Sequence, residues 1–283
     1  MNDPALTVWC ASYPKSGNTW IRALLAGVMG DGSVRLKNLV GQGAGNDQAV
    51  IFREFGLTPS VLDDDLSYAL MNEAGAAIAR RSSEPVFRKT HNSFYGTPPR
   101  GASHTLRVPC SAVYVVRDPR AVAVSLAYHL GCSQTEAVNV MANGPKINAP
   151  HSDRFMTRGC RVAFDWGSWS ANVESWLDQA DVPVVLVRYE DLCANAHIAM
   201  IPVLDKLGLT VPEDRLAQAV EESSFDQLAV QELIEGFSEA SAPDRHFFRR
   251  GQADGWVDEL EYGLEQRIVT DHGDVMRHLG YLA

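Results

Sequence analysis

Tyr13-Pro14-Lys15-Ser16-Gly17-Asn18-Thr19-Trp20 is the stretch that decides the fold. It follows an apolar run, Leu6 to Ala11, and precedes an amphipathic run, Trp20 to Met29, so the order predicts a strand, a tight loop and a helix. A loop at a helix start presents unpaired backbone N–H groups and the positive end of the helix dipole, which attract phosphate or sulfate. Gly17 permits close approach of the backbone to an anion, and Lys15 adds a full positive charge. The stretch therefore predicts an anion-binding loop.

The composition narrows the class of protein. The chain has 283 residues, enough for one large domain or two small ones, and a formal net charge of −10, which argues against a general nucleic-acid-binding surface. The apolar runs are far too short to span a bilayer, and the N-terminal residues do not resemble a signal peptide. The five cysteines are dispersed, which is typical of reduced thiols in a cytoplasm, and the histidines lack metal-ligand spacing. We expect a cytoplasmic protein formed by residues 1–283 as a single domain, with no nucleic-acid or membrane partner.

Strand and helix patterns alternate along the chain. Four short segments are predicted to be strands: Leu6–Tyr13, Pro85–Lys89, Ser111–Arg117 and Val182–Tyr189. Three of them are Val-rich and almost continuously apolar, as parallel strands buried on both faces are. Helical patterns cover Trp20–Met29, Leu66–Arg81, Ala121–Leu130, Trp169–Gln179, Ile198–Leu207 and Leu260–Leu279. This alternation predicts an α/β fold, a P-loop-like three-layer α/β/α arrangement around a mainly parallel sheet.

The loop is not a Walker A sequence. That motif places its lysine directly after the second glycine, whereas here Lys15 precedes Gly17 and no G-K-[ST] occurs in the chain. The architecture therefore resembles a P-loop, but the anion is held differently. The alternative is a structural turn with a solvated lysine.

A second anion site is indicated at the end of another predicted strand. Arg117 ends a buried strand, and Ser125 lies eight residues later, about two turns into the next helix. Open parallel sheets bind ligands at the carboxyl ends of their strands, so Arg117 is placed to grip a phosphate near Lys15. The alternative is a local Arg117–Asp118 salt bridge.

Two other motifs carry candidate chemistry. Arg88-Lys89-Thr90-His91 ends a third strand, and a histidine there is a candidate general base, a role typically worth about 10²–10⁴-fold in rate. The alternative is a structural histidine. Phe247-Phe248-Arg249-Arg250-Gly251 is a candidate anion clamp, and its alternative is a solvated basic turn.

Together the four motifs resemble the cytosolic-type sulfotransferases, which use 3′-phosphoadenosine 5′-phosphosulfate (PAPS), and they occur in that family's order between residues 13 and 256. The resemblance implies that the first loop binds the 5′-phosphosulfate, that Lys15 stabilises the leaving phosphate, and that His91 is the general base with Lys89 beside it. It implies a nucleotide site made of Lys15, Ser16, Gly17, Asn18, Thr19, Trp20, Arg117, Ser125, Tyr189, Ser224, Phe225, Arg249, Arg250 and Gly251. In this set the strand-end arginine, the helix serine and the Arg-Arg-Gly stretch would bind the 3′-phosphate.

The chain departs from the family pattern at four places. Asn18 replaces the first threonine of the loop, and Arg250 replaces a lysine. The family's G-D-W is represented by Asp254-Gly255-Trp256. No clear K-x-x-x-T-V-x-x-x-E dimerisation motif is present, so both a monomer and a homodimer stay open.

The resemblance implies transfer of a sulfuryl group from PAPS to the hydroxyl group of a small molecule, a phenol or another alcohol, with 3′-phosphoadenosine 5′-phosphate (PAP) as product and no metal. Segments 30–59 and 132–165 are long for loops and are expected to shape the acceptor pocket. Candidate aromatic residues for that pocket, the alternative being that most belong to the core, are Phe94, Tyr95, Tyr128, Phe155 and Trp166.

Three rival functions are compatible with parts of this pattern. An ATP-dependent P-loop phosphotransferase suits the strand–loop–helix start but lacks G-K-[ST]. A non-catalytic nucleotide-binding protein has no need of the candidate base His91. A membrane-tethered carbohydrate sulfotransferase would need an anchor, which we do not find in the sequence.

Overall fold

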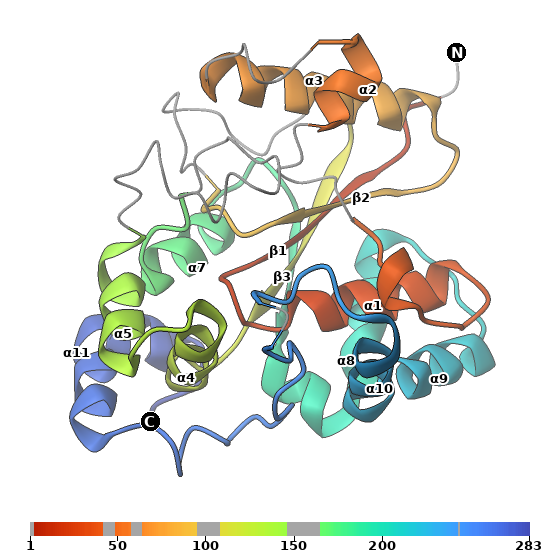
Figure 1. The fold of residues 1–283 in the computed structure, drawn as a ribbon. Helices are drawn as coiled ribbons and strands as arrows, with labels where there is room; N and C mark the ends of the chain where they lie inside the picture. The colour runs from red at the N-terminus through yellow and green to blue at the C-terminus, as the bar shows by residue number, and fades with distance from the viewer. Residues whose placement is uncertain (1–2, 42–48, 58–63, 95–107, 146–164, 243) are drawn as a thin grey trace.

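Four parallel strands in the order β2-β1-β3-β4 form the centre of the molecule (Figure 1). The computed structural model describes residues 3–41, 49–57, 64–94, 108–145, 165–242 and 244–283. The strands are β1 (Thr7–Ser12), β2 (Val86–Thr90), β3 (Cys110–Val116) and β4 (Val184–Arg188). All four predicted strands are therefore present, and the prediction of a mainly parallel sheet is confirmed.

The register of the sheet brings the ends of three strands level. Ala11 on the central strand β1 pairs with Thr90 on β2 and with Tyr114 on β3. Residues that directly follow these strands, among them His91 and Arg117, therefore leave the sheet at the same edge as the loop after β1. Ligands bind at this edge in open α/β sheets.

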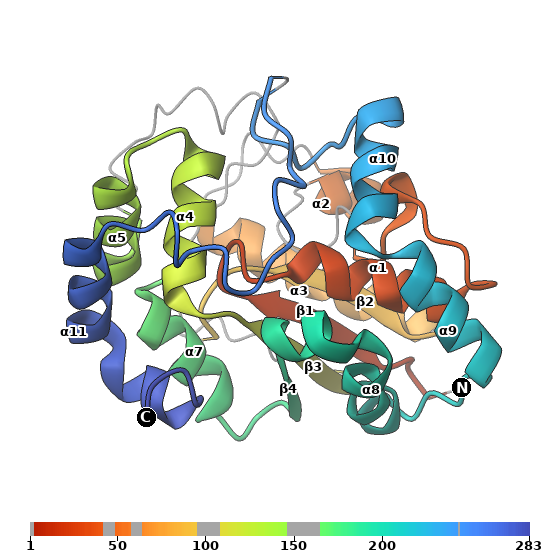
Figure 2. The same cartoon turned by 90° about the horizontal axis from the view of Figure 1, so that it is seen from below.

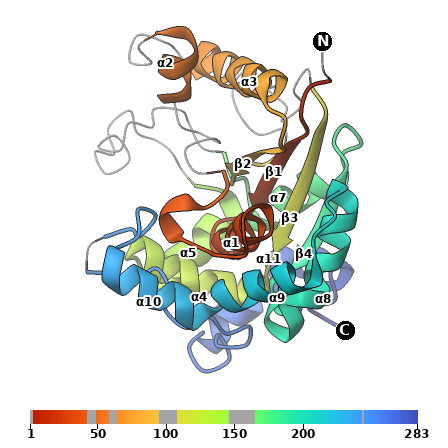
Figure 3. The same ribbon diagram turned by 90° about the vertical axis from the view of Figure 1, so that its right-hand side faces the viewer.

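Helices cover both faces of the sheet and complete the three layers (Figures 1 and 2). One face is covered by α1 (Asn18–Met29), α8 (Tyr189–Leu207) and α9 (Glu213–Glu222). The other is covered by α4 (Pro119–Leu130), α5 (Gln134–Asn143), α7 (Trp169–Leu177) and α11 (Tyr262–His278). The described chain also contains η1 (Leu36–Asn38), α2 (Ala49–Phe55), α3 (Asp64–Arg81) and α10 (Phe225–Glu235). Helices α2 and α3 pack on each other beyond the two layers (Figure 3).

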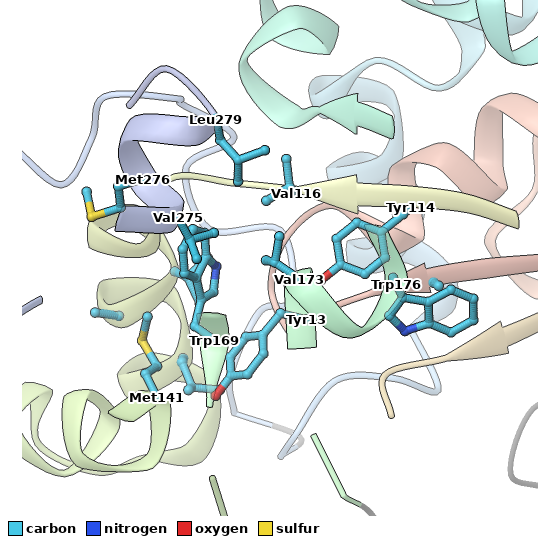
Figure 4. Close-up of a cluster of buried hydrophobic side chains, with 14 of the residues drawn as sticks. Tyr13, Tyr114, Val116, Met141, Trp169, Val173, Trp176, Val275, Met276 and Leu279 are labelled. Atoms are coloured by element: carbon cyan, nitrogen blue, oxygen red, sulfur yellow. The ribbon is translucent and has the colours of Figure 1, made fainter. Parts of the chain in front are cut away.

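Alternate residues of β1 belong to two separate hydrophobic cores, because successive side chains of a strand point to opposite faces of the sheet. Val8 and Cys10 lie in the core beneath α1, α8 and α9, whereas Trp9 and Ala11 lie in the core beneath the other helices. Figure 4 shows the second core, in which large aromatic side chains such as Trp169 fill the space between α7, α11 and the sheet. Burial of both strand faces explains the almost continuous apolar character of the strand sequences.

The structure also contains helices that the sequence patterns did not indicate: α2, α5, α9 and α10. Helix α5 lies inside segment 132–165 and begins with a capping box in which Ser133 and Glu136 bond each other's backbone N–H groups. Helix α8 begins nine residues before its expected start, at Tyr189, and bends at Asn195, whose backbone is non-helical. The rest of the two acceptor segments, at 42–48, 58–59 and 146–164, lies outside the described residues.

Two further features concern the cysteines and the helices. Four of the five cysteines lie in the described ranges, and all four are free thiols: Cys10, Cys110, Cys132 and Cys193. Among the helices of these ranges, none combines the length and the apolar character that crossing a membrane requires.

Candidate active site

The loop between β1 and α1 has a strained backbone. Lys15 has φ 66° and Gly17 has φ 104°, both in the left-handed region. For a residue with a side chain this conformation costs about 1–2 kcal/mol, so its presence at Lys15 marks a candidate functional loop. Gly17 is required for a second reason, because a Cβ atom there would lie 2.7 Å from Cδ2 of Tyr189. The loop and the start of α8 therefore fit together only with glycine at this position.

Two polar side chains of the loop turn inward. Asn18 Nδ2 donates to Cys10 O at 2.9 Å and to Ser12 Oγ at 3.2 Å, so the amide that replaces the family threonine ties the loop to β1. Ser16 is completely buried, and its Oγ has no hydrogen-bond partner among the residues that the structure describes. Buried hydroxyl groups are normally bonded, so Ser16 has unused hydrogen-bonding capacity.

Lys15 is a lysine that titrates near neutrality. Its Nζ lies 3.7 Å from the centre of the Phe247 ring, a cation–π contact. Burial, followed by the positive charges of Lys89 and Arg117, lowers the pKa of Lys15 to about 7 against the opposing effect of nearby carboxylates. An anion placed beside Lys15 would favour its charged form and raise this pKa again.

His91 is held in the state that a general base needs. Its Nδ1 lies 2.9 Å from Ser12 O. A carbonyl oxygen only accepts, so the proton belongs on Nδ1 and the lone pair on Nε2. Burial, followed by the charge of Lys89, lowers the pKa of His91 to about 3. The imidazole is therefore neutral at physiological pH, and Nε2 is the basic nitrogen.

Arg117 connects the loop to the C-terminal part of the chain. Its guanidinium carbon lies 4.2 Å from the centre of the Tyr189 ring. Nη1 donates to Lys15 O at 3.3 Å and Nη2 donates to Gln252 O at 2.8 Å, whereas Nε is buried without a partner among the described residues. The cation is thus fixed between the first loop and the stretch that follows Gly251.

The local salt bridge considered for Arg117 is not among the described ion pairs. Asp118 caps α4 by accepting from Arg120 N at 2.9 Å, and its carboxylate pairs with the Arg120 guanidinium at 2.7 Å. Ser125 is partly buried farther along α4, eight residues after Arg117 in the sequence. Asp118 therefore stabilises the start of α4, whereas the neighbouring Arg117 makes its contacts with the candidate site.

Arg249 and Arg250 share one carboxylate. Glu259 Oε2 lies 2.6 Å from Arg249 Nη1, and Glu259 Oε1 lies 3.1 Å from Arg249 Nη2 and 2.7 Å from Arg250 Nη1. The basic turn is thus held by an ion pair, a partner that the sequence motif did not indicate. The three side chains are partly exposed, so the pair is accessible to a competing anion.

Three aromatic residues of the implied nucleotide site contact other members of that set. Trp20 and Tyr189 make an edge contact with ring centres 5.6 Å apart. Gly251 has φ 65° and touches Phe225 so closely that a Cβ atom would overlap the ring. Ser224 directly precedes Phe225 as the N-cap residue of α10. In the folded chain the Ser-Phe pair therefore lies against the Arg-Arg-Gly stretch, although the two are far apart in sequence.

Glu239 is a site residue that the sequence analysis missed. Its Oε2 accepts from Lys89 Nζ at 2.9 Å and from Thr19 Oγ1 at 3.2 Å, and its Oε1 accepts from Arg22 Nη1 at 2.7 Å. Burial alone would raise the pKa of Glu239, but the charges of Lys89 and Arg22 outweigh it and hold the pKa well below its usual range. The carboxylate is therefore charged, and it lies among residues assigned to nucleotide binding and catalysis.

The aromatic candidates for the acceptor pocket lie in different environments. Phe94 is fully buried and packs on Trp176 with ring centres 5.1 Å apart, so it belongs to the core. Trp166 is partly buried beside Tyr13, at 6.2 Å between ring centres, and Tyr128 is at the surface. Tyr95 and Phe155 lie outside the described residues.

Comparisons with known proteins cover almost the whole chain. A family model described as a sulfotransferase domain matches residues 6–280. Sulfotransferase 1B1 of Mus musculus is 25% identical over 251 residues, which cover 87% of this chain and 74% of the relative. Cytosolic sulfotransferase 12 of Arabidopsis thaliana is 25% identical over 261 residues, which cover 90% and 72%.

Solved structures show the same fold at low sequence identity. Retinol dehydratase in a complex with retinol and PAP aligns with a TM-score of 0.61 at 18% identity, over 98% of this chain and 82% of that one. Mouse sulfotransferase SULT7A1 complexed with PAP aligns with a TM-score of 0.57 at 16% identity, over 98% and 86%. The predicted P-loop-like α/β/α fold is confirmed.

Proposed function

Because this chain belongs to the sulfotransferase family, we propose that it transfers a sulfuryl group from PAPS to a hydroxyl group of a small molecule. One observation carries the proposal beyond the reaction class. Lys15, His91 and Arg117 come from the ends of three adjacent strands and form a single cluster, in which His91 and Arg117 each bond to the backbone of the first loop or its strand. A base and two anion-binding cations at one sheet edge are what this transfer requires.

The residues present suit a nucleotide that is negatively charged at both ends. Lys15 and the buried hydroxyl of Ser16 lie at the helix start, and Ser16 Oγ has no partner among the described residues. Arg117, which stacks on Tyr189 and donates to Gln252 O, and the Arg249–Arg250 pair supply further cations. When bound there, PAPS supplies the sulfuryl group and leaves as PAP.

His91 is proposed to remove the proton of the acceptor hydroxyl through Nε2. The hydrogen bond from Nδ1 to Ser12 O fixes the tautomer and the orientation of the ring. The low pKa of the free imidazole keeps it neutral, and it gains basicity when negative charge arrives nearby. The proton moves to Nε2 as the acceptor oxygen forms its bond to sulfur.

Lys15 is proposed to stabilise the charge that develops on the phosphate oxygen as the bond from that oxygen to sulfur breaks. A positive charge held beside the oxygen on which negative charge develops lowers the energy of the transition state. Lys89 lies close enough to Lys15 and His91 to lower both of their pKa values, so it adds positive charge at the same centre.

Arg117, Arg249 and Arg250 are proposed to recognise the 3′-phosphate. A hydrogen bond to a charged group contributes about 1.5–3 kcal/mol, so two or three of them separate PAPS from nucleotides that lack this phosphate. The PAP complexes of retinol dehydratase and mouse SULT7A1, which share the fold, support the choice of nucleotide.

The acceptor is proposed to be a hydrophobic alcohol or phenol. Retinol dehydratase, which shares the fold, has been solved with retinol and with androsterone, two hydrophobic molecules that carry a hydroxyl group. Here Trp166 is partly buried beside Tyr13 on the side of the sheet from which His91 emerges, where an apolar acceptor would meet aromatic surface.

Calorimetric titration with PAP tests the nucleotide assignment. Arg250→Ala should weaken PAP binding by about tenfold or more, because it removes a charge-assisted contact worth about 1.5–3 kcal/mol. Arg277→Ala, which removes an exposed arginine paired with Asp274 on α11, is the matched control and should bind like the parent chain. Unchanged affinity in Arg250→Ala would overturn its assignment to the 3′-phosphate. Stabilisation by ATP with Mg²⁺ but not by PAP would favour the phosphotransferase.

A further inference from the structure

Glu239 fills an anion site made of three donors. Lys89 Nζ and Thr19 Oγ1 donate to one carboxylate oxygen, and Arg22 Nη1 donates to the other. These donors come from β2 and from two turns of α1, whereas Glu239 lies beyond the end of α10. The carboxylate of Glu239, from the C-terminal part of the chain, is therefore bound by cationic and hydroxyl donors from the N-terminal part.

Arg22 makes this a built site rather than a chance surface contact. The side chain is completely buried, and its Nε donates to Val40 O at 2.8 Å, which fixes the guanidinium independently of Glu239. Its Nη2 is also buried and has no hydrogen-bond partner among the described residues. A buried cation with spare donor capacity needs an anion beside it, because an uncompensated charge in the interior is strongly unfavourable.

Two of the three donors to Glu239 belong to the proposed active site. Thr19 lies in the loop assigned to the 5′-phosphosulfate, and Lys89 lies beside the general base. Glu239 is also near enough to Lys15 and His91 to oppose the lowering of both pKa values. A carboxylate and a phosphosulfate cannot both occupy these donors, because like charges at hydrogen-bonding distance repel strongly.

We infer that Glu239 is an internal anion that competes with the phosphosulfate end of the donor nucleotide for Lys89 and Thr19. The inference rests on the proposed function. Binding of the nucleotide displaces the Glu239 carboxylate from these two donors, and its return favours release of PAP after transfer. Glu239 thereby sets the affinity for the nucleotide without contacting the reacting atoms.

Titration of PAP into Glu239→Gln tests the competition. The neutral amide cannot replace the carboxylate as counter-charge, so the dissociation constant should fall by about tenfold or more, equivalent to about 1.4 kcal/mol of lost competition. Adenosine 5′-phosphosulfate, which has no 3′-phosphate, should show the same gain. Glu235→Gln is the matched control, since Glu235 ends α10 and pairs at 3.6 Å with the exposed Lys37; its affinity should equal that of the parent chain.

A double variant distinguishes an effect on nucleotide binding from an effect on folding. Glu239→Gln leaves Arg22 buried without a counter-charge, so Arg22→Met with Glu239→Gln removes both charges and keeps Lys89 and Thr19. Both variants should bind PAP more tightly than the parent chain. Equal or weaker binding in the folded variants, while the parent binds PAP, overturns the inference alone. No binding of PAP by the parent or any variant overturns the proposed function, and the inference with it.

Discussion

Glu259 holds Arg249 in a two-point ion pair, with its carboxylate oxygens 2.6 and 3.1 Å from the two terminal guanidinium nitrogens. The same carboxylate lies 2.7 Å from Arg250 Nη1. Both arginines assigned to the 3′-phosphate therefore share one counter-charge. A phosphate with two negative charges can replace this carboxylate, because partly exposed ion pairs contribute little.

Glu259→Gln is accordingly expected to strengthen PAP binding. The gain should reach at most about fivefold, since exposed pairs contribute about 0.2–1 kcal/mol. Adenosine 5′-phosphosulfate should bind the variant and the parent chain equally, because it has no phosphate at the position of the two arginines. Calorimetry with the two nucleotides makes the comparison, and an equal gain for both would contradict the assignment of Arg249 and Arg250.

At about pH 8, binding of PAP should be accompanied by the uptake of a proton by the protein. Free Lys15, with a pKa of about 7, is then mostly neutral, and a bound anion restores its charge. The affinity for PAP should therefore decline as pH rises above about 7, and the uptake should vanish at lower pH, where Lys15 already carries its proton. Titrations in two buffers of different ionisation enthalpy measure the uptake directly.

Lys15→Arg supplies the control for this proton. Arginine stays charged throughout the range, so the variant should bind PAP with no uptake. Uptake of the same size in the variant would assign the proton to another group.

His91→Ala should abolish turnover and leave PAP binding within about twofold of the parent chain. The base is worth about 10²–10⁴-fold in rate, while the nucleotide contacts come from other residues. His278→Ala, at the exposed end of α11, is the matched control and should turn over normally. Sulfation assayed with PAPS and a panel of phenols and sterols gives the readout, and near-normal turnover would remove His91 as the base.

Asn18→Ala should destabilise the free protein by about 1–3 kcal/mol. The variant loses two buried hydrogen bonds and leaves Cys10 O without the amide that serves it. Thermal unfolding measures the change. Asn143→Ala removes a comparable amide bond, to Asn139 O, at the exposed end of α5 and should change stability by no more than about 0.5 kcal/mol. Equal losses in both variants would show that Asn18 does not tie the loop to β1.

The strands and the first loop could be predicted because their signals are local. Continuous apolar runs such as that in β3 allow few alternatives to a buried strand, and Gly17 next to Lys15 marks the loop. Helix α9 was missed because its polar residues obscure a narrow apolar stripe, only two of its residues being buried. Helix α10 was missed because its apolar residues do not form one buried face, and Val230, Leu233 and Ile234 are exposed. Helix α5 did carry a readable signal, the capping box from Ser133 to Glu136.

The carboxylates of the site could not be predicted from sequence. Glu239 lies in a short turn without periodicity, and its partner Arg22 lies inside an apolar helix more than 200 residues earlier. The sequence around neither residue indicates that the other is its partner. Glu259 likewise follows a tryptophan-containing turn in which acidic residues are common, so its pairing with Arg249 depends on how the chain folds back.

The burial of Arg22 has a consequence for how such sequences can diverge. The side chain of Arg22 is fully inside the protein, with its terminal nitrogen 2.7 Å from Glu239, so loss of the acid alone leaves a bare positive charge in the interior. Positions 22 and 239 should therefore change together during evolution. A related sequence without an acid at position 239, in which nucleotide binding would meet no internal competitor, is expected to have an uncharged residue at position 22.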